Sequence, residues 1–172
     1  MGLYNFQPRF VPRIEIGLIH PDDPRAKTHT IRAPRKGGRE DKPGNKMHLY
    51  TGLRQKGAYR IEARAKDAPP VCVCVESVVI WGGPHWPHRG HRDDEGFHGE
   101  VWVGPFLDNV LDDEAAQGAV VAAPHCYGLQ RLDVNEVEAL ARRDGFADFA
   151  EMMTFWSGRL PFYGHIFHWR RA

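Results

Sequence analysis

One run constrains the fold of this chain more than any other. Residues 71–81, Val-Cys-Val-Cys-Val-Glu-Ser-Val-Val-Ile-Trp, are rich in β-branched side chains. Such side chains fit a pleated, half-buried surface, so the run is the strongest strand signal in the chain. Shorter strands are predicted at residues 27–32, 47–51, 59–64, 101–103, 119–123, 129–132 and 164–169. Regular helical crossovers do not separate these strands, which favours a small barrel over a parallel βαβ sheet.

Three helices are predicted beside these strands. Apolar residues recur at helical spacing over residues 6–16, and Gly17 is expected to end this helix. Asp133 is a predicted N-cap for a second helix, which ends at residues 144–145. A third helix is predicted over residues 148–156. The expected fold class is therefore α+β, a β-barrel with flanking helices.

Length and composition predict one globular domain over residues 1–172. A chain of 172 residues, 42% of them hydrophobic, can bury a real core. Residues 82–97 are rich in Gly, Pro, His, Arg and Asp, and we interpret them as an inserted polar loop. Three cysteines make no disulfide framework, and no apolar run is long enough to span a membrane. These features predict a cytoplasmic protein; its oligomeric state is left open.

The most unusual segment chemically is residues 27–32, Lys-Thr-His-Thr-Ile-Arg. In an extended strand its hydroxyls and its guanidinium would share one face, which breaks the expected alternation of apolar and polar residues. Such breaks are expected at functional sites. Lys27 and Thr30 fall on opposite faces of an ideal strand, so a joint role requires a bulge or bend. We therefore predict an irregularity at His29.

Several segments, taken in order, resemble the ASCH domain family of the PUA-like superfamily. They are residues 27–32, residues 43–44 leading into Leu-Tyr-Thr-Gly-Leu-Arg at 49–54, Asp-Gly-Phe at 144–146, and Pro-Phe-Tyr-Gly at 161–164. The resemblance covers nearly the whole chain. It implies a compact β-barrel with a cleft that receives a nucleobase, a nucleoside or RNA. Some bacterial members are small amidohydrolases that remove the acyl group from N(4)-acetylcytidine.

The resemblance also implies catalytic residues. The enzymes of the family use a Lys, a Thr three residues later and a downstream Glu. Lys27 and Thr30 match the first two, and Asp144 aligns with the Glu. Thr30 would be the nucleophile, and Lys27 the base once its pKa is lowered by burial. Asp144 would orient Lys27 or bind the cytosine amine, and Arg32 would lower the Lys27 pKa or hold the oxyanion. No cofactor is expected.

A second hypothesis is a binding module, or a ribonuclease-type ASCH protein, that acts on RNA or a modified base. Basic residues concentrate between positions 32 and 60 and would contact phosphates, although the net charge of the whole chain is only +1. Aromatic side chains would stack on an exposed base. The predicted contacts for substrate or RNA are Thr28, Arg32, Tyr50, Arg54, Phe162 and Tyr163.

A metal site is a third alternative. His85, His88 and His91 recur at every third residue of the polar loop. A structural zinc site needs four ligands in tetrahedral geometry, and this loop lacks a cysteine. A packed surface loop explains the pattern as readily, so the sequence predicts no metal.

Overall fold

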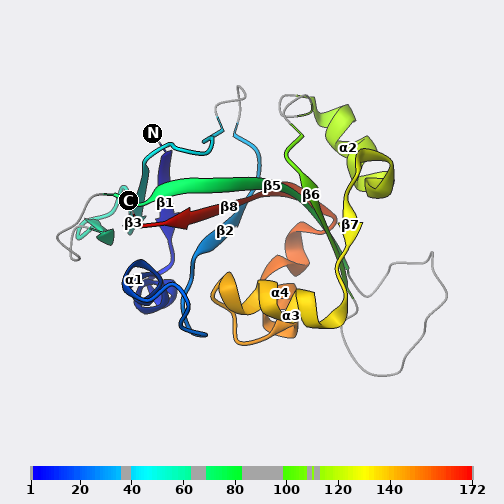
Figure 1. Cartoon of the computed structure of the whole chain (residues 1–172). Helices are drawn as coiled ribbons and strands as arrows, with labels where there is room; N and C mark the ends of the chain where they lie inside the picture. The colour runs from blue at the N-terminus through cyan, green and yellow to red at the C-terminus, as the bar shows by residue number, and fades with distance from the viewer. Residues whose placement is uncertain are drawn as a thin grey trace.

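The computed structural model describes residues 2–35, 40–62, 69–82, 99–107, 110 and 113–171. Its strands are β1 (Gly2–Phe6), β2 (His29–Arg32), β3 (Met47–Thr51), β4 (Tyr59–Arg60), β5 (Val71–Gly82), β6 (Gly99–Pro105), β7 (Gln130–Arg131) and β8 (Phe162–Arg170). Strands β1-β3-β4 form one sheet, and β2-β8-β5-β6-β7 form a second. The long β5 and β8 cross the middle of the molecule, and both chain ends lie near β1 and β3 (Figure 1).

The α-helices are α1 (Val11–Ile19), α2 (Glu114–Ala122), α3 (Val134–Arg143) and α4 (Phe149–Trp156). Helices α3 and α4 pack together beneath the β5–β8 pair, whereas α2 lies at the far end beside β7 (Figure 1). The predicted cap of α3 is confirmed: the Asp133 carboxylate accepts bonds from two backbone N–H groups, and the Glu136 carboxylate accepts one from the Asp133 backbone N–H. None of the described helices combines the length and apolar character needed to cross a membrane.

The α+β prediction is confirmed, but the described strands do not close into a barrel. The two sheets meet at one corner, where Lys46 and Val71 form a single bridge. Strand β1 pairs only with β3, and β2 pairs only with β8, among the described strands. Among the described residues, the edges of β1 and β2 therefore do not pair with each other. Arg32 of β2 spans the opening: it donates to the Asn5 carbonyl of β1, and its guanidinium lies over the Phe6 ring.

Three local predictions were wrong. Strand β1 was not predicted, because Phe6 was assigned to the apolar face of the first helix; that helix starts later and runs to Ile19. Gly17 does not end it. Residues 119–123 were predicted as a strand but lie mostly in α2, which begins at the N-cap Asp113. The predicted polar loop at about 82–97 lies outside the described residues beyond Gly82.

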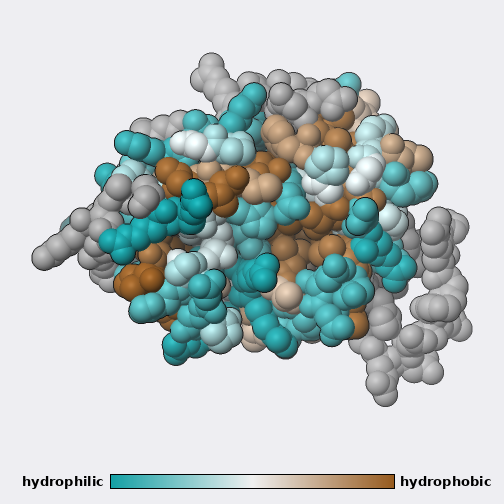
Figure 2. All heavy atoms as spheres, in the orientation of Figure 1, coloured by the Kyte–Doolittle hydropathy of each residue, from teal (hydrophilic) through white to brown (hydrophobic). Residues whose placement is uncertain are grey.

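The main hydrophobic core draws on both sheets and on three helices. Ile14 of α1, Leu49 of β3, Leu140 of α3, Met153 of α4 and Phe167 of β8 all belong to it. On the outside, hydrophobic residues still reach the surface in patches over the middle of one face, bordered by hydrophilic residues (Figure 2). The core thus holds the two sheets and the α3–α4 pair in fixed relative positions around the open edge.

Candidate functional site

A pocket of about 650 Å³ opens between the unpaired edges of β1 and β2. Its walls come from these two strands, from the residues that follow α3, from α4 and the turn after it, and from the start of β8. Pockets of this size are large enough for a small-molecule ligand. The lining includes all three residues predicted to be catalytic, Lys27, Thr30 and Asp144.

Lys27 is the least expected residue of this pocket, because its whole side chain is buried. A buried lysine requires a partner, and here it has one. Its ammonium donates to Asp144 Oδ1 at 2.5 Å and to the Asp144 backbone carbonyl. Its backbone N–H donates to the Arg13 carbonyl at 2.9 Å, which ties the segment to α1. Lys27 is therefore held in one position from both ends.

Asp144 reaches Lys27 because of the way that α3 ends. Asp144 is the C-cap of the helix, and Gly145 follows at φ +96°, a left-handed conformation that favours glycine. A Cβ at Gly145 would lie 2.8 Å from the Phe10 ring and 3.2 Å from Cδ of Lys27. The sequence Asp-Gly-Phe thus turns the chain tightly over the lysine and directs the carboxylate inward.

Burial shifts the pKa values of both partners. It lowers the pKa of Lys27 to about 8, from 10.5 in water; the charges of Arg32 and Arg13 act in the same direction, and Asp144 opposes them. Burial raises the pKa of Asp144, against the opposite pull of Lys27 and Arg32. Loss of water destabilises both ionised forms, so a proton moves between the two groups at a lower cost than it would in water.

Thr30 shares the pocket with Lys27, although no bulge separates them. The pairing of β2 with β8 runs from His29 to Arg32 without a register shift, so of the bulge or bend predicted at His29, the bulge is not found. Instead the strand begins only at His29, and Lys27 lies outside it, where strand alternation does not apply. The Thr30 hydroxyl has no hydrogen-bond partner among the described residues, and it makes no bond to Lys27.

Aromatic rings form much of the remaining wall. The Lys27 nitrogen lies 5.1 Å from the ring centre of Phe10 and 5.8 Å from that of Phe6. Trp156 and Phe162 also line the pocket, with ring centroids 4.3 Å apart and ring planes tilted by 36°. Flat apolar walls of this kind accept a planar heterocycle, and the predicted role of Phe162 in stacking is compatible with its position.

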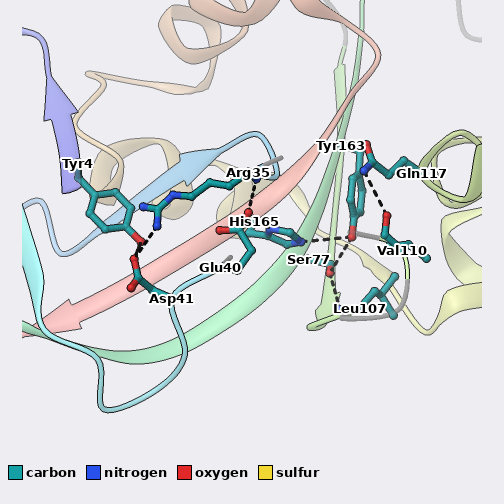
Figure 3. Close-up of polar contacts among 10 residues, drawn as sticks. All are labelled: Tyr4, Arg35, Glu40, Asp41, Ser77, Leu107, Val110, Gln117, Tyr163 and His165. Carbon is teal, nitrogen blue, oxygen red and sulfur yellow. Dashed lines mark hydrogen bonds and ion pairs between the residues drawn. The ribbon is translucent and has the colours of Figure 1, made fainter. Parts of the chain in front are cut away.

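Guanidinium groups line the mouth of the pocket: Arg32 of β2, Arg35 after it and Arg159 in the turn after α4. Arg35 is held by Asp41, at 3.1 Å, and the same carboxylate accepts a bond from the Tyr4 hydroxyl (Figure 3). Arg32 donates to the Asn5 carbonyl at 2.8 Å.

The other predicted contacts do not line this pocket. Thr28 lines a second pocket of about 570 Å³ beside α3. Tyr50 lies in β3 and Arg54 in the turn after it. Tyr163 is next to Phe162 in β8, and strand alternation sends it to the opposite face. There its hydroxyl lies 3.5 Å from that of Ser77 and 3.3 Å from His165, in a separate core cluster (Figure 3).

Several residues of the pocket were not predicted. Phe6 and Phe10 were interpreted only as an apolar helix face, although their aromatic character is the signal that marks them here. Phe146 belongs to a motif that was noted for the resemblance, but it was given no role. Arg159 has no signal in its sequence neighbourhood, since only the turn after α4 brings it to the pocket.

The metal alternative concerns residues that the structure does not describe, because His85, His88 and His91 lie outside the described ranges. Within the described ranges, no group of three or more His, Cys, Asp or Glu side chains could hold a metal ion.

Comparison with known proteins identifies no relative. No protein-family model matches the chain, and no curated protein and no solved structure matches it significantly. The geometry of the pocket is therefore the basis for any functional conclusion.

Proposed function

We propose that this protein is a PUA-like, ASCH-type amidohydrolase that removes the acyl group from N(4)-acylated cytosine nucleosides. One observation carries the proposal: a fully buried lysine, paired with a carboxylate and with its pKa lowered to about 8, shares a pocket with an uncommitted threonine hydroxyl. Structural lysines are rarely buried, and perturbed pKa values gather at functional sites. The family assignment rests on the order of the sequence motifs, and two of them, residues 27–32 and 144–146, meet at this pocket.

Thr30 is the nucleophile in this proposal. Its oxygen attacks the acyl carbonyl carbon while the neutral Lys27 amine takes the hydroxyl proton. The tetrahedral intermediate collapses with cleavage of the bond from carbon to the cytosine N4, and the Lys27 ammonium returns the proton to that nitrogen. Water then attacks the acyl-threonine ester, again with Lys27 as base, and releases the carboxylic acid and the free threonine.

Arg32 and Asp144 support the reaction by charge. Arg32 lies on the same strand as Thr30 and lines the pocket, and its charge adds to burial in lowering the pKa of Lys27, which favours the neutral amine. Asp144 holds the Lys27 nitrogen in place and compensates the charge that appears on it when it accepts a proton. The stacked pair of Trp156 and Phe162 offers a flat wall for the cytosine ring.

Replacement of the Thr30 hydroxyl tests the nucleophile. Thr30→Val keeps the branched shape of this buried side chain but lacks the hydroxyl. We expect hydrolysis of N(4)-acetylcytidine to fall roughly 10³-fold or more. Thr30→Ser keeps a hydroxyl and should retain measurable turnover. Chromatographic detection of cytidine measures both variants; a Thr30→Val protein as active as the wild type would exclude this mechanism.

The pH dependence of the rate tests the base. Only neutral Lys27 accepts a proton, and its neutral fraction increases as the pH rises towards its pKa of about 8. We therefore expect kcat/KM to rise roughly tenfold per pH unit below this value and to level off above it. The measurement needs circular dichroism at each pH to confirm that the protein stays folded. A rate that is flat across this range would contradict the role of Lys27.

The alternative is a non-catalytic module that binds RNA or a modified base. The aromatic wall and the arginines at the mouth of the pocket favour a base-bearing ligand in either case. Tight binding of N(4)-acetylcytidine with no product after long incubation would support the binding module over the enzyme.

A further inference from the structure

The pocket has more positive charge than its partners neutralise. Its described lining contains four cations, Lys27, Arg32, Arg35 and Arg159, and one anion, Asp144. Lys27 pairs with Asp144, and Arg35 pairs with Asp41. Within the described part of the chain, neither Arg32 nor Arg159 has a carboxylate within ion-pair distance. Two guanidinium charges therefore line the same pocket without an ion-pair partner among the described residues.

These charges are also close together. Burial lowers the pKa of Arg32; the charges of Asp144 and Tyr4 oppose this shift, and the repulsion from Arg35 and Arg159 adds to it. One guanidinium nitrogen of Arg32, Nε, is buried and has no hydrogen-bond partner in the part of the chain that the structure describes, while Nη2 donates to the Asn5 carbonyl. Converging like charges and an unsatisfied buried donor both cost free energy, and an anion from a ligand would remove both costs.

The end of the pocket that Arg159 and Arg32 line adjoins its aromatic wall. The Arg159 guanidinium carbon lies 5.8 Å from the ring centres of both Phe155 and Trp156. Trp156 in turn stacks on Phe162. A ligand with a flat base on this wall would therefore carry its anionic group towards Arg159 and Arg32.

We propose that this pocket binds the phosphate of a nucleotide, with Arg32 and Arg159 as its ligands, so that the preferred substrate is an N(4)-acylated cytidine monophosphate and not the free nucleoside. The inference rests on the proposed function for the identity of the base. A guanidinium presents paired N–H donors that match a phosphate, which explains two arginines here in place of lysines.

Binding of unmodified ligands tests this preference independently of turnover. Trp156 lines the pocket, so tryptophan fluorescence or calorimetry can follow titration with cytidine and with cytidine 5′-monophosphate. We expect the monophosphate to bind roughly tenfold to hundredfold more tightly, because charge-assisted hydrogen bonds add to the contacts of the base. This preference should weaken as salt rises from about 0.05 M to about 0.5 M.

In Arg159→Gln, the affinities for cytidine and for its monophosphate should differ by less than about threefold. The matched control is Arg131→Gln, an exposed arginine of β7 outside the pocket that removes the same charge; it should keep the wild-type preference. Equal binding of cytidine and its monophosphate, or equal effects of the two variants, would overturn the inference.

Two further ligands separate the nucleotide from other sources of phosphate. Ribose 5-phosphate that binds as tightly as cytidine monophosphate would overturn the role of the base. A single-stranded cytidine oligonucleotide that binds more than about tenfold tighter than the monophosphate would overturn the proposal of a mononucleotide ligand and favour RNA. Binding of the monophosphate without hydrolysis of any acylated ligand would refute only the proposed function.

Discussion

Lys27→Met should abolish hydrolysis and strongly destabilise the fold. Without the general base, we expect the rate to fall by about 10²- to 10⁴-fold. The free energy of unfolding should fall by about 3–5 kcal/mol, because the substitution leaves the Asp144 carboxylate buried without the ammonium that lies 2.5 Å away. Urea denaturation measures the stability, and chromatography of the nucleoside measures the rate.

The double variant Lys27→Met/Asp144→Leu separates the two effects. Replacing both members of a buried ion pair by apolar residues is often neutral or stabilising. We therefore expect the double variant to recover most of the lost stability and to remain inactive. Lys46→Met serves as the stability control, since Lys46 is exposed and its loss should change the free energy by about 0.5 kcal/mol or less. A double variant that recovers activity would exclude Lys27 from the chemistry.

Gly17→Ala should destabilise the protein, although alanine normally favours a helix over glycine. An added Cβ at Gly17 would lie 2.4 Å from the Lys27 carbonyl oxygen and 3.0 Å from its carbon. Both are backbone atoms, so α1 and the segment before β2 must move apart. We expect a loss of about 1–3 kcal/mol in the free energy of unfolding. Hydrolysis should also decrease, because the displaced backbone carries Lys27.

The matched control for this prediction is Gly118→Ala in α2. No atom lies within 4 Å of a Cβ added at Gly118, so the variant should gain about 0.5–1 kcal/mol from helix propensity alone. Thermal and urea denaturation of the two variants should therefore give changes of opposite sign. A gain in stability for Gly17→Ala would show that the close contact between α1 and Lys27 does not exist in solution.

The elements that the sequence predicted correctly are those specified by neighbouring residues. The boundaries of Met47–Thr51 were predicted as observed, because its alternating burial follows a period of two. The helix after Asp133 was predicted from a local cap and an apolar face. The strand expected at residues 119–123 failed for the opposite reason: Val120 and Val121 have β propensity, but the cap at Asp113 starts a helix through them.

Local sequence patterns could not determine whether the strands close into a barrel. Closure depends on whether the edges of β1 and β2 pair, and this depends on how the whole chain packs and not on neighbouring residues. In the described residues they do not pair, and the opening between them forms the pocket. The feature that the barrel prediction missed is therefore the pocket that Lys27 and Thr30 line.

The sequence alone determined which chemical groups are available: a lysine, hydroxyls and an arginine within residues 27–32, and an Asp-Gly turn that ends a helix. Residue types and short-range spacing carry that information. Only the tertiary structure brought Asp144, 117 positions away, to the Lys27 nitrogen and removed both from water. Desolvation and the convergence of charges depend on how the whole chain packs, so the lowered pKa of Lys27 was only an expectation from the resemblance, and the cluster of Arg32 with Arg159 has no signature in the sequence.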